Sequence, residues 1–129
     1  MLFEHNFYCT SDRSLDIEFL FVELAPSRWR IYILSDIPYG SRSTGATDIH
    51  RLVEGDETMK TKIRNFIAVT HGTVNPSRNI HYICWSKDIT DLEAAHSVAK
   101  AWGEITAHYI KYGGSFPSIQ KTLSDRHII

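Results

Sequence analysis

The sequence predicts an α+β fold, in which an antiparallel sheet of four to five strands carries one long C-terminal helix packed on one face. Residues 3–34 alternate between apolar and polar positions in three runs that short turn clusters separate. Residues 90–112 repeat apolar side chains at the three- and four-residue spacing of a helix. A chain of 129 residues, 43% apolar and 22% charged, has room for one core, so we expect a single domain over residues 1–129.

The three N-terminal runs predict an antiparallel meander. They cover residues 3–9, 15–22 and 29–34, with turn clusters at Ser11–Ser14 and Ala25–Arg28 between them. The second half of the middle run is apolar at successive positions, as in a strand that is covered on both faces.

The middle of the chain carries weaker signals. Residues 35–48 are rich in Gly, Ser and Pro and predict a long loop, which is uncommon in a small domain unless it is mobile or functional. Residues 49–53 are a candidate fourth strand. Residues 56–69 carry apolar side chains at helical spacing and favour a short helix, although residues 66–70 also fit a strand. Aromatic and β-branched side chains predict a further strand over residues 79–85.

Residues 1–85 are thus mainly β, and the helix over residues 90–112 is the clearest element. Thr90 is a suitable N-cap, with Glu93 three residues on as in a capping box. Two successive glycines end the helix. The tail, residues 113–129, is expected either to form a short second helix or to become ordered only against a partner chain.

The apolar face of this helix is wide, and a small sheet need not cover all of it. Exposed aromatic side chains are favoured at protein interfaces. We therefore expect a homodimer that buries the surplus through the tail or through Trp102, Ile105, Tyr109 and Ile110.

Charge is distributed unevenly along a chain whose net charge is −1. Residues 1–27 carry one basic and five acidic side chains, net −4, whereas residues 28–78 carry eight basic and five acidic ones, net +3. The near-neutral total argues against general DNA binding and against a polybasic membrane binder. The basic middle is either ordinary solvated charge or a patch for a small anionic ligand such as a nucleotide. The residues expected in such a site are Arg28, Arg30, Tyr39, Arg42 and Arg51.

Signatures of catalysis are weak. The sequence has no glycine-rich phosphate loop, nucleophile elbow or zinc-ligand spacing, so we expect no metal and no cofactor, and an enzyme is the less favoured class. The nearest approach is His71 with Thr73 after an apolar run, which is half of the signature of two-histidine phosphoesterases. The second His-x-Thr or His-x-Ser that this chemistry needs is missing from the sequence.

The two cysteines and the N-terminus bear on the compartment. Cys9 and Cys84 lie in apolar stretches and are expected to be reduced, buried thiols. The N-terminus lacks the basic and apolar regions of a signal peptide, and no stretch reaches the ~18 apolar residues of a membrane span. These features predict a cytoplasmic protein.

Several segments resemble small, mostly uncharacterised proteins that bacterial phages and integrated mobile elements encode. The shared motifs are strands, a capping box and a helix face; they cover about half of the chain, and residues 54–78 look like an insertion. The resemblance implies an inhibitor of a host or defence protein, or a sponge for a signalling nucleotide. The segments concerned are Trp29–Leu34, Ile80–Ser86, Ile89–Ala95, Ala99–Trp102 and Tyr109–Gly113.

Three functions follow from these observations. The leading hypothesis is a non-enzymatic binding protein of phage or mobile-element origin that inhibits a host or defence factor in the bacterial cytoplasm. The alternative is a nucleotide-sequestering module that uses the basic, aromatic-containing middle of the chain. The third is a small phosphoesterase centred on His71 and Thr73.

Overall fold

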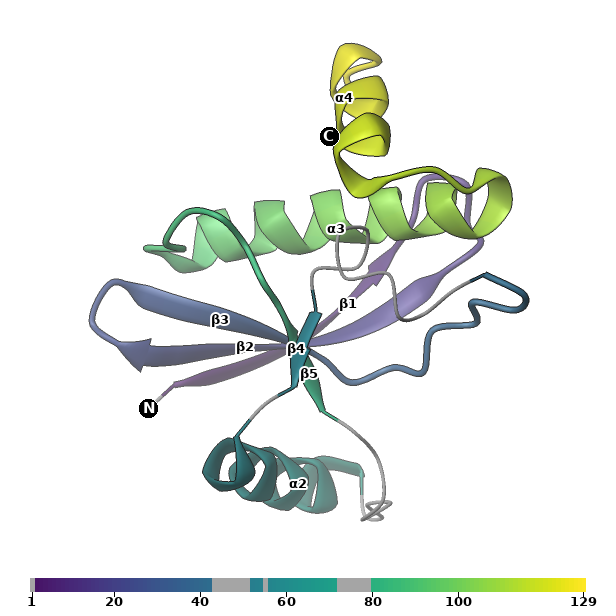
Figure 1. Cartoon of the computed structure of the whole chain (residues 1–129). Coiled ribbons are helices and arrows are strands. Elements are labelled where there is room, and N and C mark those ends of the chain that lie inside the picture. The colour runs from purple at the N-terminus through teal and green to yellow at the C-terminus, as the bar shows by residue number, and fades with distance from the viewer. Residues whose placement is uncertain (1, 43–51, 55, 72–79) are drawn as a thin grey trace.

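The computed structural model describes residues 2–42, 52–54, 56–71 and 80–129, and its strands form one antiparallel sheet in the order β1-β2-β3-β5-β4 (Figure 1). This arrangement confirms the α+β class and the antiparallel sheet. The elements in chain order are β1 (Phe3–Cys9), β2 (Asp16–Ala25), β3 (Arg28–Ile33), β4 (Leu52–Glu54), α2 (Glu57–His71), β5 (His81–Ile83), α3 (Leu92–Tyr112) and α4 (Phe116–Asp125).

The first three strands form the predicted meander. β1 pairs with β2 without interruption, from Phe3 opposite Val22 to Cys9 opposite Asp16. β2 pairs with β3 as far as an irregularity between Glu23 and Ala25, just before the turn into β3.

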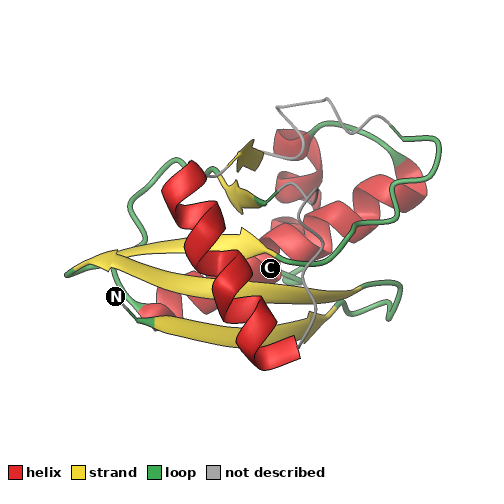
Figure 2. Ribbon diagram, turned by 90° about the horizontal axis from the view of Figure 1, so that it is seen from below, coloured by secondary structure: helices red, strands yellow, loops and turns green. Residues whose placement is uncertain are grey.

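Helices cover both faces of this sheet, so the expectation of a single helix on one face was incomplete. α3 and α4 lie on one side and α2 lies on the other (Figures 1 and 2). Phe19 and Phe21 of β2 belong to the core beneath α3, whereas Leu20 and Val22 belong to the core against α2. The successive apolar positions of this strand therefore do mark burial on two faces.

The ends of α3 follow the predicted scheme with one correction. The N-cap is Asp91 and not Thr90, because the Asp91 carboxylate accepts a hydrogen bond of 2.7 Å from the backbone N–H of Ala94. At the other end Gly113 has φ +74°, and its N–H donates to the carbonyl of Tyr109. A left-handed residue of this kind ends a helix, and glycine adopts that conformation without steric cost.

The tail forms the short second helix that was one of its two expected states. Ser115 caps α4, and Pro117 stands in its first turn, where proline costs no hydrogen bond. Phe116, Ile119 and Leu123 of α4 are buried in the same core as α3. α4 therefore covers part of α3 that the sheet leaves open.

This covering corrects the expected helix interface. Trp102, Ile105 and Tyr109 are 0%, 1% and 6% exposed, and Ile110 is half-buried against the same core. These side chains pack in or against the chain's own core, because the sheet and α4 together are wide enough to enclose them. Trp102, Ile105 and Tyr109 therefore offer no free apolar surface for a partner, and Ile110 offers only part of its side chain.

The expectations for the loop and the short helix were confirmed where the structure describes them, whereas the expectation for the two cysteines was wrong. Residues 35–42 form no helix or strand, as predicted for the start of the loop, and residues 43–48 lie outside the described part. The region of residues 56–69 is helical, as favoured. Cys9 and Cys84 are exposed and not buried, because one ends an outer strand and the other follows β5 into a loop. None of the described helices has the length and apolar character that crossing a membrane requires.

Polar contacts fasten the β1–β2 turn to α3. Glu104, 5% exposed, accepts hydrogen bonds from the Tyr8 hydroxyl at 2.7 Å and from both the N–H and the hydroxyl of Ser11. Asp12 forms an ion pair of 2.7 Å with Lys111 in the last turn of α3. Burial, and then the bond to Glu104, raise the pKa of Tyr8 well above its usual range.

The revised N-cap predicts unequal effects of two adjacent substitutions. Asp91→Ala removes the side chain that accepts from Ala94 N–H and should lower the free energy of unfolding by about 1 kcal/mol. Thr90→Ala should change it by less than about 0.5 kcal/mol. Urea denaturation of both variants measures this, and a larger loss in Thr90→Ala would contradict the assignment.

The Asp12–Lys111 pair predicts a loss of stability in acid. The bond to Lys111, and then that to Ser14, hold the folded-state pKa of Asp12 well below its usual range. Its contribution is therefore complete above the unfolded-state pKa of about 3.9 and is lost as the pH falls towards the folded-state value. We expect the free energy of unfolding to decrease between about pH 5 and pH 2, and to decrease less in Asp12→Asn. Denaturation curves with the same pH dependence in both proteins would rule this out.

Candidate functional site

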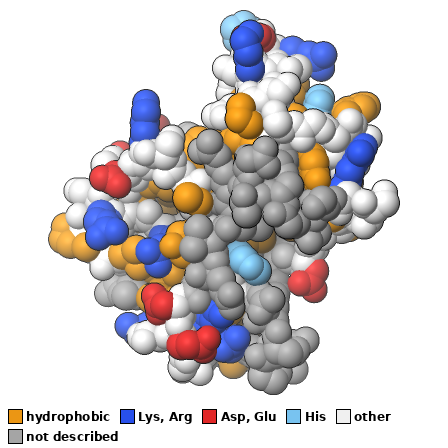
Figure 3. Space-filling model, viewed as in Figure 1, with side chains coloured by type: hydrophobic (Ala, Val, Ile, Leu, Met, Phe, Trp, Pro, Cys, Tyr) orange, Lys and Arg blue, Asp and Glu red, His pale blue; other side chains and the backbone are white. Residues whose placement is uncertain are grey.

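A small cavity beside the β2–β3 hairpin combines basic and aromatic side chains, and we call it the basic hollow. Its volume is about 150 Å³. On this side of the molecule, basic side chains lie next to hydrophobic ones (Figure 3, left). The residues that define the basic hollow are Arg28, Trp29, Arg30, Tyr82, Cys84, Trp85, Lys87 and Asp88, with Leu24, Ile83 and Ile89 as apolar walls.

The hollow exists because β5 pairs with only part of β3. Tyr82 and His81 lie opposite Tyr32 and Ile33, at the far end of β3 from the hairpin. Beyond Ile83 the chain leaves the sheet and returns at Ile89, whose carbonyl accepts a hydrogen bond of 2.8 Å from Trp29 N–H. The segment between Ile83 and Ile89 therefore arches past the first residues of β3 and leaves a space between.

Arg30 is held against the aromatic wall of the hollow. Its guanidinium carbon lies 4.1 Å from the centre of the Tyr82 ring, which is a cation–π contact. One of its N–H groups donates to the Tyr32 hydroxyl at 3.1 Å. Tyr32 is fully buried, so this bond fixes the guanidinium to the core of the sheet. Among the described residues its other N–H donors have no hydrogen-bond partner, and a guanidinium fork of this kind matches the oxygens of an anion.

Arg28 and Lys87 supply cations that the described part of the chain leaves uncompensated. Both are exposed, and none of the ion pairs or side-chain hydrogen bonds among the described residues includes either one. Arg28 and Arg30 alternate along β3, so they project from the same face of the strand. With Asp88 as the single acidic side chain, the hollow has a net charge of +2.

Two tryptophans give the hollow an apolar side. Trp29 and Trp85 are half-buried and pack against the α3-side core. The Trp85 ring meets Phe116 of α4 edge-on, with 6.2 Å between ring centres. The two tryptophans therefore border the hollow from the α3 side of the sheet, whereas Arg28 and Arg30 lie on the other face of β3, as Tyr32 does.

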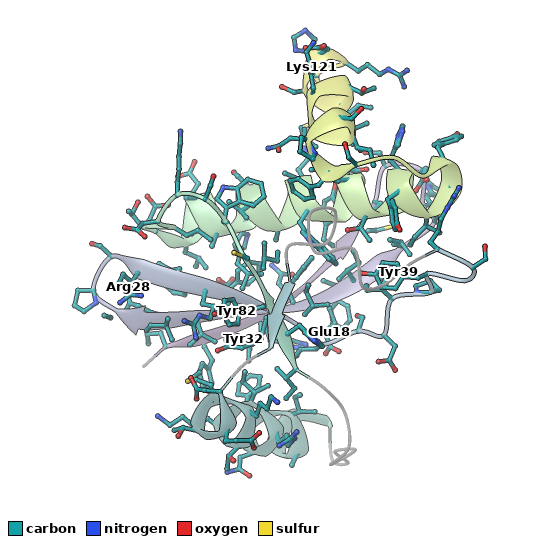
Figure 4. All side chains as sticks on the ribbon, in the orientation of Figure 1. Glu18, Arg28, Tyr32, Tyr39, Tyr82 and Lys121 are labelled. Carbon is teal, nitrogen blue, oxygen red and sulfur yellow. The ribbon has the colours of Figure 1, made fainter. Side chains whose placement is uncertain are left out.

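The structure brings together two of the five residues expected in an anion site. Arg28 and Arg30 line the hollow, whereas Tyr39 lies at the opposite end of the sheet from Arg28 (Figure 4). Arg42 donates to the carbonyls of Ile110 and Lys111, both at 3.3 Å, at the C-terminal end of α3. The hollow is beside Ile89, before the N-terminal end of that helix, so about 30 Å of helix separates Arg42 from it.

The remaining sequence-based candidates do not join the hollow. Arg51 and Thr73 lie outside the described residues. His71 is the last residue of α2, so the apolar run that precedes it is helical and is not a strand.

Sequence reasoning missed Lys87, Tyr82 and Trp85. The alternation of Arg28 and Arg30 along a strand was a usable signal, because it places both side chains on one face. The other three residues belong to a segment more than fifty positions later. Only the pairing of β5 with β3 brings the two segments together, and no local pattern encodes that pairing.

A second cavity of about 150 Å³ lies where the β1–β2 turn meets α3 and α4. Three of its charged groups already have partners: Asp12 pairs with Lys111, and Glu104 accepts three hydrogen bonds from Tyr8 and Ser11. Burial, and then nearby Arg126, lower the pKa of His108 in its wall, which favours the neutral ring. Among the described residues there is no group of three or more metal-ligating side chains here or elsewhere. The basic hollow is therefore the stronger candidate for a ligand site.

Comparison of the chain with protein-family models, with curated proteins and with solved structures found no match. The resemblance to phage-encoded proteins therefore stays a prediction. The function has to be inferred from the geometry of the basic hollow.

The place of Arg42 predicts a structural effect without a binding effect. Arg42→Ala removes two hydrogen bonds and a positive charge from the C-terminal end of α3, and should cost about 1 kcal/mol of stability. Lys100→Ala is the matched control, because it removes an exposed cation from the first half of the same helix. Thermal denaturation measures both, and equal melting temperatures for the two variants would contradict this role.

Proposed function

We propose that the protein is a non-enzymatic binding protein whose basic hollow takes the phosphate of a nucleotide. The observation that carries the proposal is the set of three cations, Arg28, Arg30 and Lys87, around one cavity. Arg28 and Lys87 have no acidic partner among the described residues. Clustered cations repel one another, so a site of this kind gains from an anion that neutralises them.

The chemistry of the walls narrows the class of anion. Arginine presents parallel N–H groups that match two phosphate oxygens, and Arg30 is already oriented by Tyr82 and Tyr32. Trp29 and Trp85 add indole surface, which a purely inorganic anion would not use. A phosphate joined to a planar base uses both kinds of group.

The size of the hollow sets the mode and the strength of binding. A volume of about 150 Å³ is smaller than the roughly 300–1,000 Å³ of pockets that enclose a whole ligand. The hollow therefore binds one group of the ligand, the phosphate, and the rest of the nucleotide lies over the neighbouring surface. Such partial enclosure fits sequestration or sensing better than turnover, which needs catalytic groups held close to the bond that breaks.

Inhibition of a host or defence protein remains the rival function. It was based partly on an apolar helix face, which is in fact buried beneath the sheet and α4. The rival would be favoured if the protein bound no nucleotide but captured one specific host protein.

A thermal-shift panel of mono-, di- and cyclic nucleotides tests the proposal. A ligand at ten times its dissociation constant adds about 1.4 kcal/mol, which is roughly 5 °C for a domain of this size. Arg28→Ala and Lys87→Ala should each weaken binding about tenfold or more, because each removes a charged contact to phosphate.

Lys121→Ala is the control for loss of positive charge. Lys121 lies on α4, away from the labelled residues of the hollow (Figure 4), and pairs with Asp125. The affinity of Lys121→Ala for the nucleotide should equal that of the wild type. A flat panel, or an equal loss of affinity in all three variants, would refute the proposal.

A further inference from the structure

The outer strand β1 has a row of backbone hydrogen-bonding groups that point away from the sheet. β1 lies at one edge of the sheet (Figure 2), and within the described part of the chain its seven residues pair with β2 alone. An open edge strand of this length is a template for pairing with another chain unless charge, proline or a bulge blunts it. β1 contains no lysine, arginine or proline, and its ladder with β2 has no bulge.

The hydrogen bonds at the two ends of the ladder show which groups point outwards. Glu23 N–H donates to the Leu2 carbonyl, and Thr10 N–H donates to the Leu15 carbonyl, both at 2.9 Å. Paired residues in an antiparallel ladder bond to the partner strand at alternate positions. Even-numbered residues of β1 therefore bond to β2, and the outward groups belong to Phe3, His5, Phe7 and Cys9.

A contact at the middle of the strand agrees with this assignment. The Phe7 N–H donates to the side-chain oxygen of Asn6 at 2.9 Å, so it is not engaged with β2. The Phe7 side chain is 57% exposed, and its ring lies edge-on to the His5 ring, with 5.2 Å between the ring centres.

We infer that β1 is a dimerisation edge that pairs antiparallel with β1 of a second copy of this chain, with Asn6 opposite Asn6. In that register Phe3 lies opposite Cys9 and His5 lies opposite Phe7, each pair occurring twice. All four outward residues then exchange hydrogen bonds. A shift of two residues either way leaves outward groups unpaired, so the backbone selects this register.

Side-chain chemistry supports a second copy as the occupant. Glu4 lies opposite Tyr8, so the register places no like charges opposite each other. Phe3 and His5 contact Phe66 of α2, so the odd-numbered side chains share the α2 side of the sheet. The exposed Phe7 ring of each copy therefore comes to lie beside His5 of the other and loses its contact with water. The Asn6 amide must rotate away from Phe7 N–H and can bond to its counterpart instead.

Mass measurement by light scattering over a series of concentrations gives the first test. The wild type should rise from its monomer mass of 14.8 kDa towards twice that value. Phe7→Lys should raise the dimer dissociation constant about tenfold or more, because it brings charge to the centre of the edge. Leu2→Lys is the matched control, since Leu2 is 62% exposed but precedes the strand, and it should dimerise like the wild type.

Cysteine cross-linking tests the register independently of any destabilised variant. Opposed residues of a non-hydrogen-bonded pair have Cα atoms about 4.5 Å apart, within the range of a disulfide. In a background with Cys9→Ser and Cys84→Ser, Asn6→Cys should therefore give a reducible dimer under mild oxidation, and Leu2→Cys should not. A monomeric mass up to millimolar concentration, or equal cross-linking at both positions, would overturn the inference.

Discussion

Burial of apolar side chains on both faces of the central strands is the constraint on which the rest of the structure depends. β2 sends Phe19 and Phe21 to one core and Leu20 and Val22 to the other, and each such side chain contributes about 1.5–3 kcal/mol. A sheet that is apolar on both faces needs a helical layer on each. α3 with α4 supplies one layer and α2 supplies the other, so little apolar surface of either face remains free.

This constraint leaves the margins of the sheet as the places where we propose contacts with other molecules. Beyond the point where β5 stops pairing with β3, the chain passes the first residues of β3, and the basic hollow lies between the two segments. Arg30 is fixed there between Tyr82 and Tyr32. At the opposite margin, among the described residues, β1 pairs with β2 on one side only, and its other side keeps its outward N–H and C=O groups. The two proposed contacts, with an anion and with a second copy, therefore use separate parts of the molecule and can operate independently.

The sequence was informative where the pattern is local. Alternation located the first three strands, and helical spacing located α3 and α2. It was less informative where burial depends on the partner element: Trp102 and Tyr109 looked surplus because nothing in the sequence shows that α4 folds back over α3. Arg28 and Arg30 were found because they share a strand, whereas Arg42 was grouped with them by charge alone and instead caps α3 from the other end.

The three tryptophans allow one direct test of the claim that the basic hollow binds nucleotides. Trp29 and Trp85 line the hollow, and Trp102 is fully buried in the core beneath α3. We would record the three indole N–H signals by nuclear magnetic resonance during titration with a nucleotide identified by thermal shift. The account predicts saturable shifts of the Trp29 and Trp85 signals and a Trp102 signal that stays in place. Signals of Trp29 and Trp85 that do not move while the ligand binds would show that the ligand binds elsewhere and would contradict the account.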